Sequence, residues 1–111
     1  MREIKTDKRS YEEIKIGGRA YKLDLSDEAL DRHSRKFPEM AREIGALEAA
    51  GSLDVQTFKV FLKDAINWLY LDEPFEAISE GCGGNAAAIA RVFNESAQAL
   101  REILAGAKGR D

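Results

Sequence analysis

The chain has 111 residues, of which 44% are hydrophobic and 33% charged, and its net charge is -3. This size and composition predict one globular domain with a single core, and the acidic balance argues against an autonomous nucleic-acid-binding protein. One cysteine and one histidine exclude an internal disulfide and a Cys/His zinc site, and the lack of a bilayer-length apolar run or a signal-peptide core predicts a cytoplasmic protein without a membrane segment.

The first predicted elements are a flexible arm and a β-hairpin. Residues 1–10 are polar, mixed in charge and without periodicity, which is typical of a loose terminus. Over residues 11–25, apolar and polar side chains alternate on either side of Gly17 and Gly18, and two glycines suit a two-residue turn that needs positive φ. An isolated hairpin is only marginally stable in water, so we expect its apolar face to pack on the rest of the chain. That face contains Ile14, Ile16, Tyr21, Leu23 and Leu25.

A long helix is predicted over residues 27–50. Ser26 is a good N-cap, and Gly51 ends the pattern. Pro38 lies inside the helix, where it removes a backbone donor and disfavours helical geometry at the preceding residue. One face of this helix has mostly apolar residues at spacings of three and four, and this pattern continues on both sides of the proline. We therefore expect a kink rather than a break. The members of this face are Leu30, His33, Phe37, Met40, Ile44 and Leu47.

A second helix is predicted over residues 54–71, with Asp54 as its N-cap. Its apolar stripe covers more than half of its circumference, which is typical of a central helix or of one that also meets a second chain. The residues expected on its inner side are Val55, Phe58, Phe61, Leu62, Ala65, Ile66 and Leu69.

Two further helices complete the predicted domain. A short helix occupies residues 73–80, and a last amphipathic helix, capped by Asn85, occupies residues 85–105. Residues 106–111 are expected to form a flexible tail. These elements predict an α+β fold in which an N-terminal β-hairpin packs on a bundle of three to four α-helices, as a single domain over residues 11–105.

The sequence offers few candidates for chemistry. The turn Gly81–Gly84 could present backbone N–H groups to an anion, but it lacks a preceding strand and a Lys-Ser/Thr pair, which favours a tight helix-to-helix turn. Cys82 has only His33 as a potential base, and a turn cysteine with a buried or interface histidine is favoured over a catalytic pair. The acidic residues of the short helix lack calcium-loop spacing. We therefore predict a non-enzymatic protein with no catalytic, cofactor or metal site.

The helical stripes supply candidates for contacts with another protein. Trp68 and Tyr70 flank Leu69 on adjacent helical positions, so at least one of them is expected at the edge of the core. Aromatic residues in such places either cover the rim of the core or anchor an interface, and both interpretations stay open. The predicted interaction residues are Phe37, Met40, Ile44, Phe61, Trp68 and Tyr70.

Three stretches and the order of the elements resemble a known family. The stretches are Lys15–Leu30, Ala65–Tyr70, and Phe75–Ile78 with the glycine turn that follows it. They resemble small tail-module proteins of long-tailed phages and prophages, of the tail assembly chaperone type. The resemblance implies a non-enzymatic helical protein in the bacterial host cytoplasm that binds the tape measure protein, self-associates and helps to recruit the major tail protein. Pro38 departs from the family's pattern in the long helix.

Two other functions stay open at this point. One is a regulatory module that binds a small anion or nucleotide at residues 81–84, and a ligand-dependent rise in melting temperature would favour it. The other is a structural tail completion protein that stays in the particle, which detection of the chain in mature virions would favour.

Overall fold

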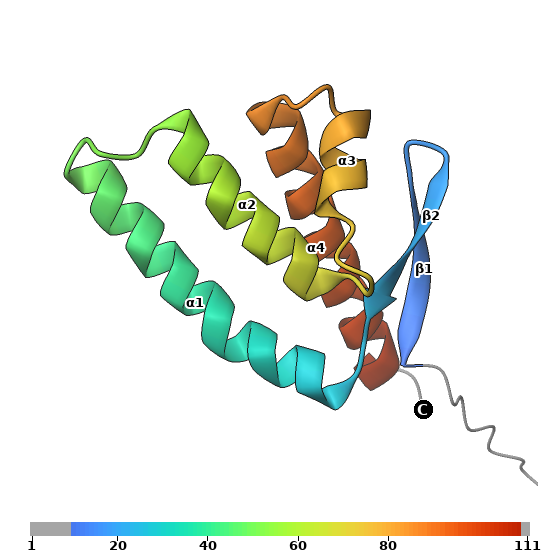
Figure 1. Ribbon diagram of the computed structural model, residues 1–111. Helices are drawn as coiled ribbons and strands as arrows, with labels where there is room; N and C mark the ends of the chain where they lie inside the picture. Colours follow the sequence, from blue (N-terminus) through green and yellow to red (C-terminus); the bar gives the residue numbers. More distant parts are fainter. Residues whose placement is uncertain (1–9, 110–111) are drawn as a thin grey trace, which may run out of the picture.

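The computed structural model describes residues 10–109, which form an antiparallel β-hairpin followed by four helices (Figure 1). The predicted α+β fold, a hairpin packed on a helical bundle, is confirmed. Most of the predicted arm at residues 1–10 lies outside the described residues. The elements are β1 (Tyr11–Ile16), β2 (Arg19–Asp24), α1 (Asp27–Ala49), α2 (Val55–Leu69), α3 (Phe75–Gly81) and α4 (Ala86–Gly109).

The hairpin closes through the predicted glycine turn. Gly17 and Gly18 have φ values of 58° and 85°, the left-handed conformation that a primed two-residue turn requires. The hairpin is also joined to the helices through its backbone. Leu23 forms an isolated antiparallel bridge with Tyr70, which directly follows α2. The N–H of the next residue along, Leu71, donates to the β2 carbonyl of Lys22 at 2.9 Å.

The core lies between the inner face of the hairpin and α2, α3 and α4. As predicted, α2 is central, since α1 packs on one side of it and α4 on another (Figure 1). The predicted apolar face of the hairpin is confirmed, because Leu23 is fully buried and the other four members pack against the core. The buried apolar cluster consists of Leu23, Leu62, Ile66, Leu69, Tyr70, Phe75, Ile78, Ile89 and Leu100.

The predicted N-caps are confirmed. The side chains of Ser26, Asp54 and Asn85 each accept a hydrogen bond from the backbone N–H three residues further on, at 3.1, 2.8 and 2.9 Å. These bonds satisfy backbone donors that the first turn of a helix leaves without an intrahelical acceptor. The short α3 lacks such a cap of its own, but the Asn67 side chain of α2 accepts from the N–H of Phe75 at 3.0 Å.

Two predictions about the helices need correction. The last helix does not end at residue 105 as predicted, because α4 continues to Gly109, and the rest of the predicted tail lies outside the described residues. A glycine costs a helix only about 1 kcal/mol relative to alanine, and alanines flank Gly106 on both sides. Val55 does not face inward but is 58% exposed. It lies in the first turn of α2, beyond the residues of that helix that reach the core.

Candidate partner-binding surface

The N-terminal half of α1 is fastened to the end of α2 by polar side chains. The carbonyl oxygen of Trp68 lies in the last turn of α2, where it has no intrahelical donor. Arg32 Nη2 donates to this oxygen at 3.0 Å, and His33 Nε2 donates to it at 2.8 Å. His33 is only 7% exposed. It is therefore a buried, hydrogen-bonded histidine, the interpretation that the sequence favoured, whereas the role of Arg32 was missed.

Phe37 lies between three helices, although the sequence suggested a partner contact. Its ring stacks on His33 with centroids 5.0 Å apart, and lies 5.8 Å from the ring of Trp68 and 5.7 Å from that of Phe93. Phe37 is half-buried and packs against the core. Trp68 is half-buried as well, at the edge of the same aromatic group. Both residues therefore hold α1, α2 and α4 together, and Trp68 also keeps an exposed side.

Tyr70 belongs to the core, and its selection as an interaction residue is wrong. The side chain is 2% exposed, and its hydroxyl lies 2.6 Å from the hydroxyl of Ser96 in α4. Burial raises the pKa of Tyr70, and the bond to Ser96 partly opposes this. Tyr70 is buried because it leaves the helical path of α2 at the point where the chain pairs with β2. A helical periodicity could not place it correctly.

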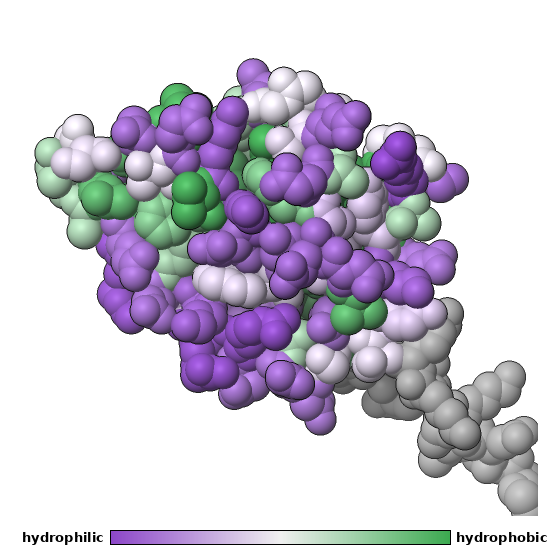
Figure 2. Space-filling model, in the orientation of Figure 1, coloured by the Kyte–Doolittle hydropathy of each residue, from purple (hydrophilic) through white to green (hydrophobic). Residues whose placement is uncertain are grey.

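The remaining candidates lie outside the core. Met40 and Ile44 of α1 and Phe61 of α2 are half-buried, and none of them belongs to the buried cluster or packs against it. We call these three residues the α1–α2 surface. Figure 2 shows apolar residues at this end of the molecule, at the left, above a mostly hydrophilic face of α1. Val60 of α2 is also 59% exposed.

A small notch opens along this surface. It has a volume of about 150 Å³, and Met40, Phe61 and Trp68 contribute its apolar walls. Its charged residues are three acids and one base, namely Glu39, Glu43, Asp64 and Lys36. The notch therefore combines space for a single apolar side chain with a rim of net negative charge.

The glycine turn does not offer free amides to an anion. The N–H groups of Cys82, Gly83, Gly84 and Asn85 all donate to backbone carbonyls of residues 78–82. A phosphate site at a helix N-terminus needs such groups pointing at the ligand. The hydrogen bonding therefore favours the predicted tight turn between α3 and α4.

The described residues show no arrangement for metal or nucleophilic chemistry. No group of three or more His, Cys, Asp or Glu side chains among residues 10–109 is placed to hold a metal ion. His33 is engaged with Trp68 and Phe37, and none of its described contacts is with Cys82. Cys82 is half-buried at the end of α3.

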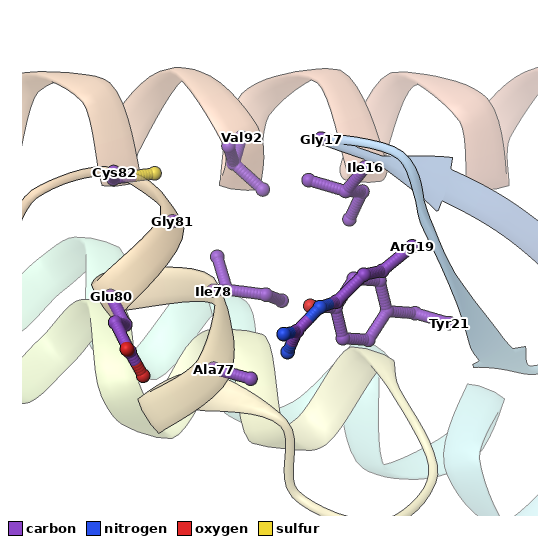
Figure 3. Close-up of a pocket in the computed structure, with 10 residues that line it drawn as sticks. All are labelled: Ile16, Gly17, Arg19, Tyr21, Ala77, Ile78, Glu80, Gly81, Cys82 and Val92. Carbon is purple, nitrogen blue, oxygen red and sulfur yellow. The ribbon is translucent and has the colours of Figure 1, made fainter.

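A larger cleft, which was not predicted from the sequence, separates the hairpin from α3. Its volume is about 480 Å³, and Figure 3 shows Ile16 and Tyr21 of the hairpin facing Ile78 of α3 and Val92 of α4 across it. Arg19, which also lines the cleft, lies beside the Tyr21 ring in this view. The period of two already places Arg19 on the same face as Tyr21, and a charged residue on an apolar face was the available signal.

None of the described helices has a stretch long and apolar enough to cross a bilayer. Comparison of the chain with protein-family models, curated proteins and solved structures gave no match.

Proposed function

We propose that this chain is a non-enzymatic, tail assembly chaperone-like protein of the bacterial host cytoplasm. In this proposal it holds an amphipathic helix of the tape measure protein on the α1–α2 surface and assists assembly of the tail tube, with the major tail protein as a further partner. The observation that carries the proposal is the set of half-buried apolar side chains at Met40, Ile44 and Phe61, which neither belong to the core nor pack against it.

The geometry of the surface suits a helical ligand. Met40 and Ile44 are one turn apart on α1, and Phe61 of α2 lines the same notch as Met40. An amphipathic helix binds by laying apolar side chains at similar spacing into such a groove. The acids around the notch keep the surface hydrated when it is empty, and they favour a partner with basic residues beside its apolar face.

The same surface could instead join copies of this chain or hold it permanently in a tail. Self-association is part of the proposal, because an apolar surface that binds one helix can bind another. A structural tail completion protein would use the surface in the finished particle, whereas a chaperone leaves before that stage. The bonded amides of the glycine turn give the anion-binding alternative no support.

The test is co-expression with the tape measure protein of the same genome, followed by size exclusion with light scattering. We expect a soluble complex with several copies of this chain per tape measure chain. The Met40→Gln/Ile44→Gln double variant should lose co-elution, since it removes apolar area from the binding surface.

The matched control is the Ala41→Gln/Ala46→Gln double variant, which places the same new side chains at exposed positions of α1. It should bind like the unaltered chain, and both variants should keep the helical circular dichroism spectrum. An insoluble tape measure protein beside a monomeric chain, or equal binding by both double variants, would contradict the proposal.

A further inference from the structure

Within the described residues, the edge of β2 that faces α3 is unpaired at its tip. In an antiparallel ladder, alternate residues direct both their N–H and C=O toward the same neighbouring strand. The carbonyl of Lys22 points away from β1, because it accepts from the N–H of Leu71. Ala20, two residues earlier, therefore points its N–H and C=O the same way. Among residues 10–109, no third strand reaches Ala20.

The chain itself begins to pair with this edge and then leaves it. Tyr70 and Leu71 lie antiparallel to the base of β2. The next two residues, Asp72 and Glu73, have φ values of 65° and 44°, a left-handed conformation that is uncommon for residues other than glycine. This turn directs the chain into α3 and leaves the tip of β2 free. The edge is therefore shown to accept a strand, and its continuation is vacant within the described residues.

The cleft between the hairpin and α3 lies beside this vacant edge. Its hairpin side carries Ile16, Arg19 and Tyr21, which share one face of the two strands. Its far side carries Ile78, which is 2% exposed. In a sheet, a residue on an added strand points to the same face as the residue opposite it. A side chain opposite Tyr21 would therefore enter the cleft, whose volume of about 480 Å³ has room for it.

The charge of Arg19 favours a particular residue type on such a strand. Running antiparallel to β2 in line with Tyr70 and Leu71, it would meet Tyr21 first and Arg19 two residues later. Opposite charges on directly opposed residues stabilise a strand pair. Arg19 is exposed, and Figure 3 shows its guanidinium apart from the Glu80 carboxylate, with Ala77 and Ile78 between them in this view. The cleft therefore fits an apolar residue followed, two positions on, by an acidic one.

We propose that the groove between β2 and α3 binds an extended peptide segment of a partner protein, which adds to β2 as an antiparallel strand. The segment pairs with the backbone of Ala20, inserts an apolar side chain beside Tyr21 and places an Asp or Glu opposite Arg19. This site is separate from the α1–α2 surface and does not depend on it. Strand addition of this kind takes its affinity from backbone hydrogen bonds and its specificity from pockets for alternate side chains.

The experiment is selection of short random peptides on the immobilised full chain, followed by fluorescence polarisation with the enriched peptide. We expect enrichment of an apolar residue two positions before Asp or Glu. The Ala20→Pro variant should weaken binding by about tenfold or more, because it removes an outward backbone donor and leaves the β1–β2 ladder intact. The matched control is Lys15→Pro, which blocks the outer edge of β1 at the position paired with Ala20 and should bind normally.

A second variant keeps the test informative if Ala20→Pro fails to fold. Arg19→Glu alters an exposed side chain and should change the enriched acidic position to Lys or Arg. The absence of any enriched peptide, or equal binding to the Ala20→Pro and Lys15→Pro variants, would overturn the proposal. A dimer of the chain alone that dissociates on Ala20→Pro would also overturn it, since a second copy would then cover the edge. Peptide binding that persists in the Met40→Gln/Ile44→Gln variant separates this site from the proposed chaperone function.

Discussion

The carbonyl that His33 contacts sets the tautomer of its neutral ring. The Trp68 oxygen can only accept a hydrogen bond, so Nε2 of His33 carries a proton, and in the neutral ring Nδ1 does not. Nδ1 is buried and has no hydrogen-bond partner. Protonating it would place a charge and an unpaired donor inside the protein. Burial accordingly lowers the pKa of His33 below its usual value of 6.5, and the bond to Trp68 opposes this only in part.

This lowered pKa predicts that acid weakens the fold. Above pH 6.5 the histidine is neutral in both the folded and the unfolded chain, and its contribution is constant. As the pH falls through 6.5, His33 binds a proton more readily in the unfolded chain than in the folded chain. The free energy of unfolding therefore decreases until His33 is also protonated in the folded chain. The measurement is urea unfolding over a pH series, compared with His33→Gln.

Glutamine at this position keeps a donor for Trp68 but does not titrate. As the pH falls, the unaltered chain should therefore lose free energy of unfolding relative to His33→Gln. This loss should level off below the pKa of His33 in the folded state. A difference that stays constant over the whole pH series would contradict the assignment.

At the scale of elements, α1 runs without interruption from Asp27 to Ala49 although it contains Pro38. The proline offers no N–H to the carbonyl of Ser34, one turn earlier, and its ring crowds that carbonyl. Pro38 is exposed, so the helix loses no core contact there. The packing of Phe37 against Trp68 and Phe93, on the inner side of the same turn, holds the two halves of α1 in one helix.

If the packing of α1 tolerates Pro38 rather than requires it, Pro38→Ala should stabilise the chain. Restoring the missing hydrogen bond and removing the ring should raise the free energy of unfolding by about 1–3 kcal/mol. The control is Ala41→Pro, at an exposed position of the same helix, which should lower it by about 3 kcal/mol. Denaturant unfolding measures both changes. A loss of stability in Pro38→Ala would instead mean that the proline shapes α1 for its contact with α2.

At the scale of the whole molecule, burial is uneven. The fully buried large side chains come from β2, α2 and α4, namely Leu23, Ile66, Leu69 and Ile89. Beyond Pro38, the apolar residues of α1 are only half-buried, among them Met40, Ile44 and Leu47. Local stability follows the number of buried apolar contacts. The part of the molecule that carries the α1–α2 surface should therefore open more readily than the core.

Hydrogen exchange can measure this difference. Backbone amides of α2 near Ile66 should exchange only through global unfolding, whereas amides of α1 near Ile44 should exchange by local opening, about tenfold faster or more. The readout is native-state exchange followed by mass spectrometry or NMR. Equal protection of the two regions would show that α1 unfolds only together with the core, and would remove the reason to expect an adaptable binding surface.

Local signals in the sequence were sufficient for the elements and their order. These signals are the two glycines of the primed turn, the three N-cap side chains and the repeat of apolar residues along each helix. Each of them depends only on residues within about four positions along the chain. The wide apolar stripe of the second helix indicated a central helix or one that also meets a second chain. The local signals also placed Met40, Ile44 and Phe61 on the stripes that form the α1–α2 surface.

Only the tertiary structure decided which apolar residues are used up by the core. Tyr70 is buried because the chain leaves α2 there to pair with β2, and Val55 is exposed because the core ends before the first turn of that helix. The cleft beside Tyr21 depends in the same way on where α3 crosses the hairpin. Periodicity reports which side of an element is apolar, whereas burial depends on which distant segment covers that side.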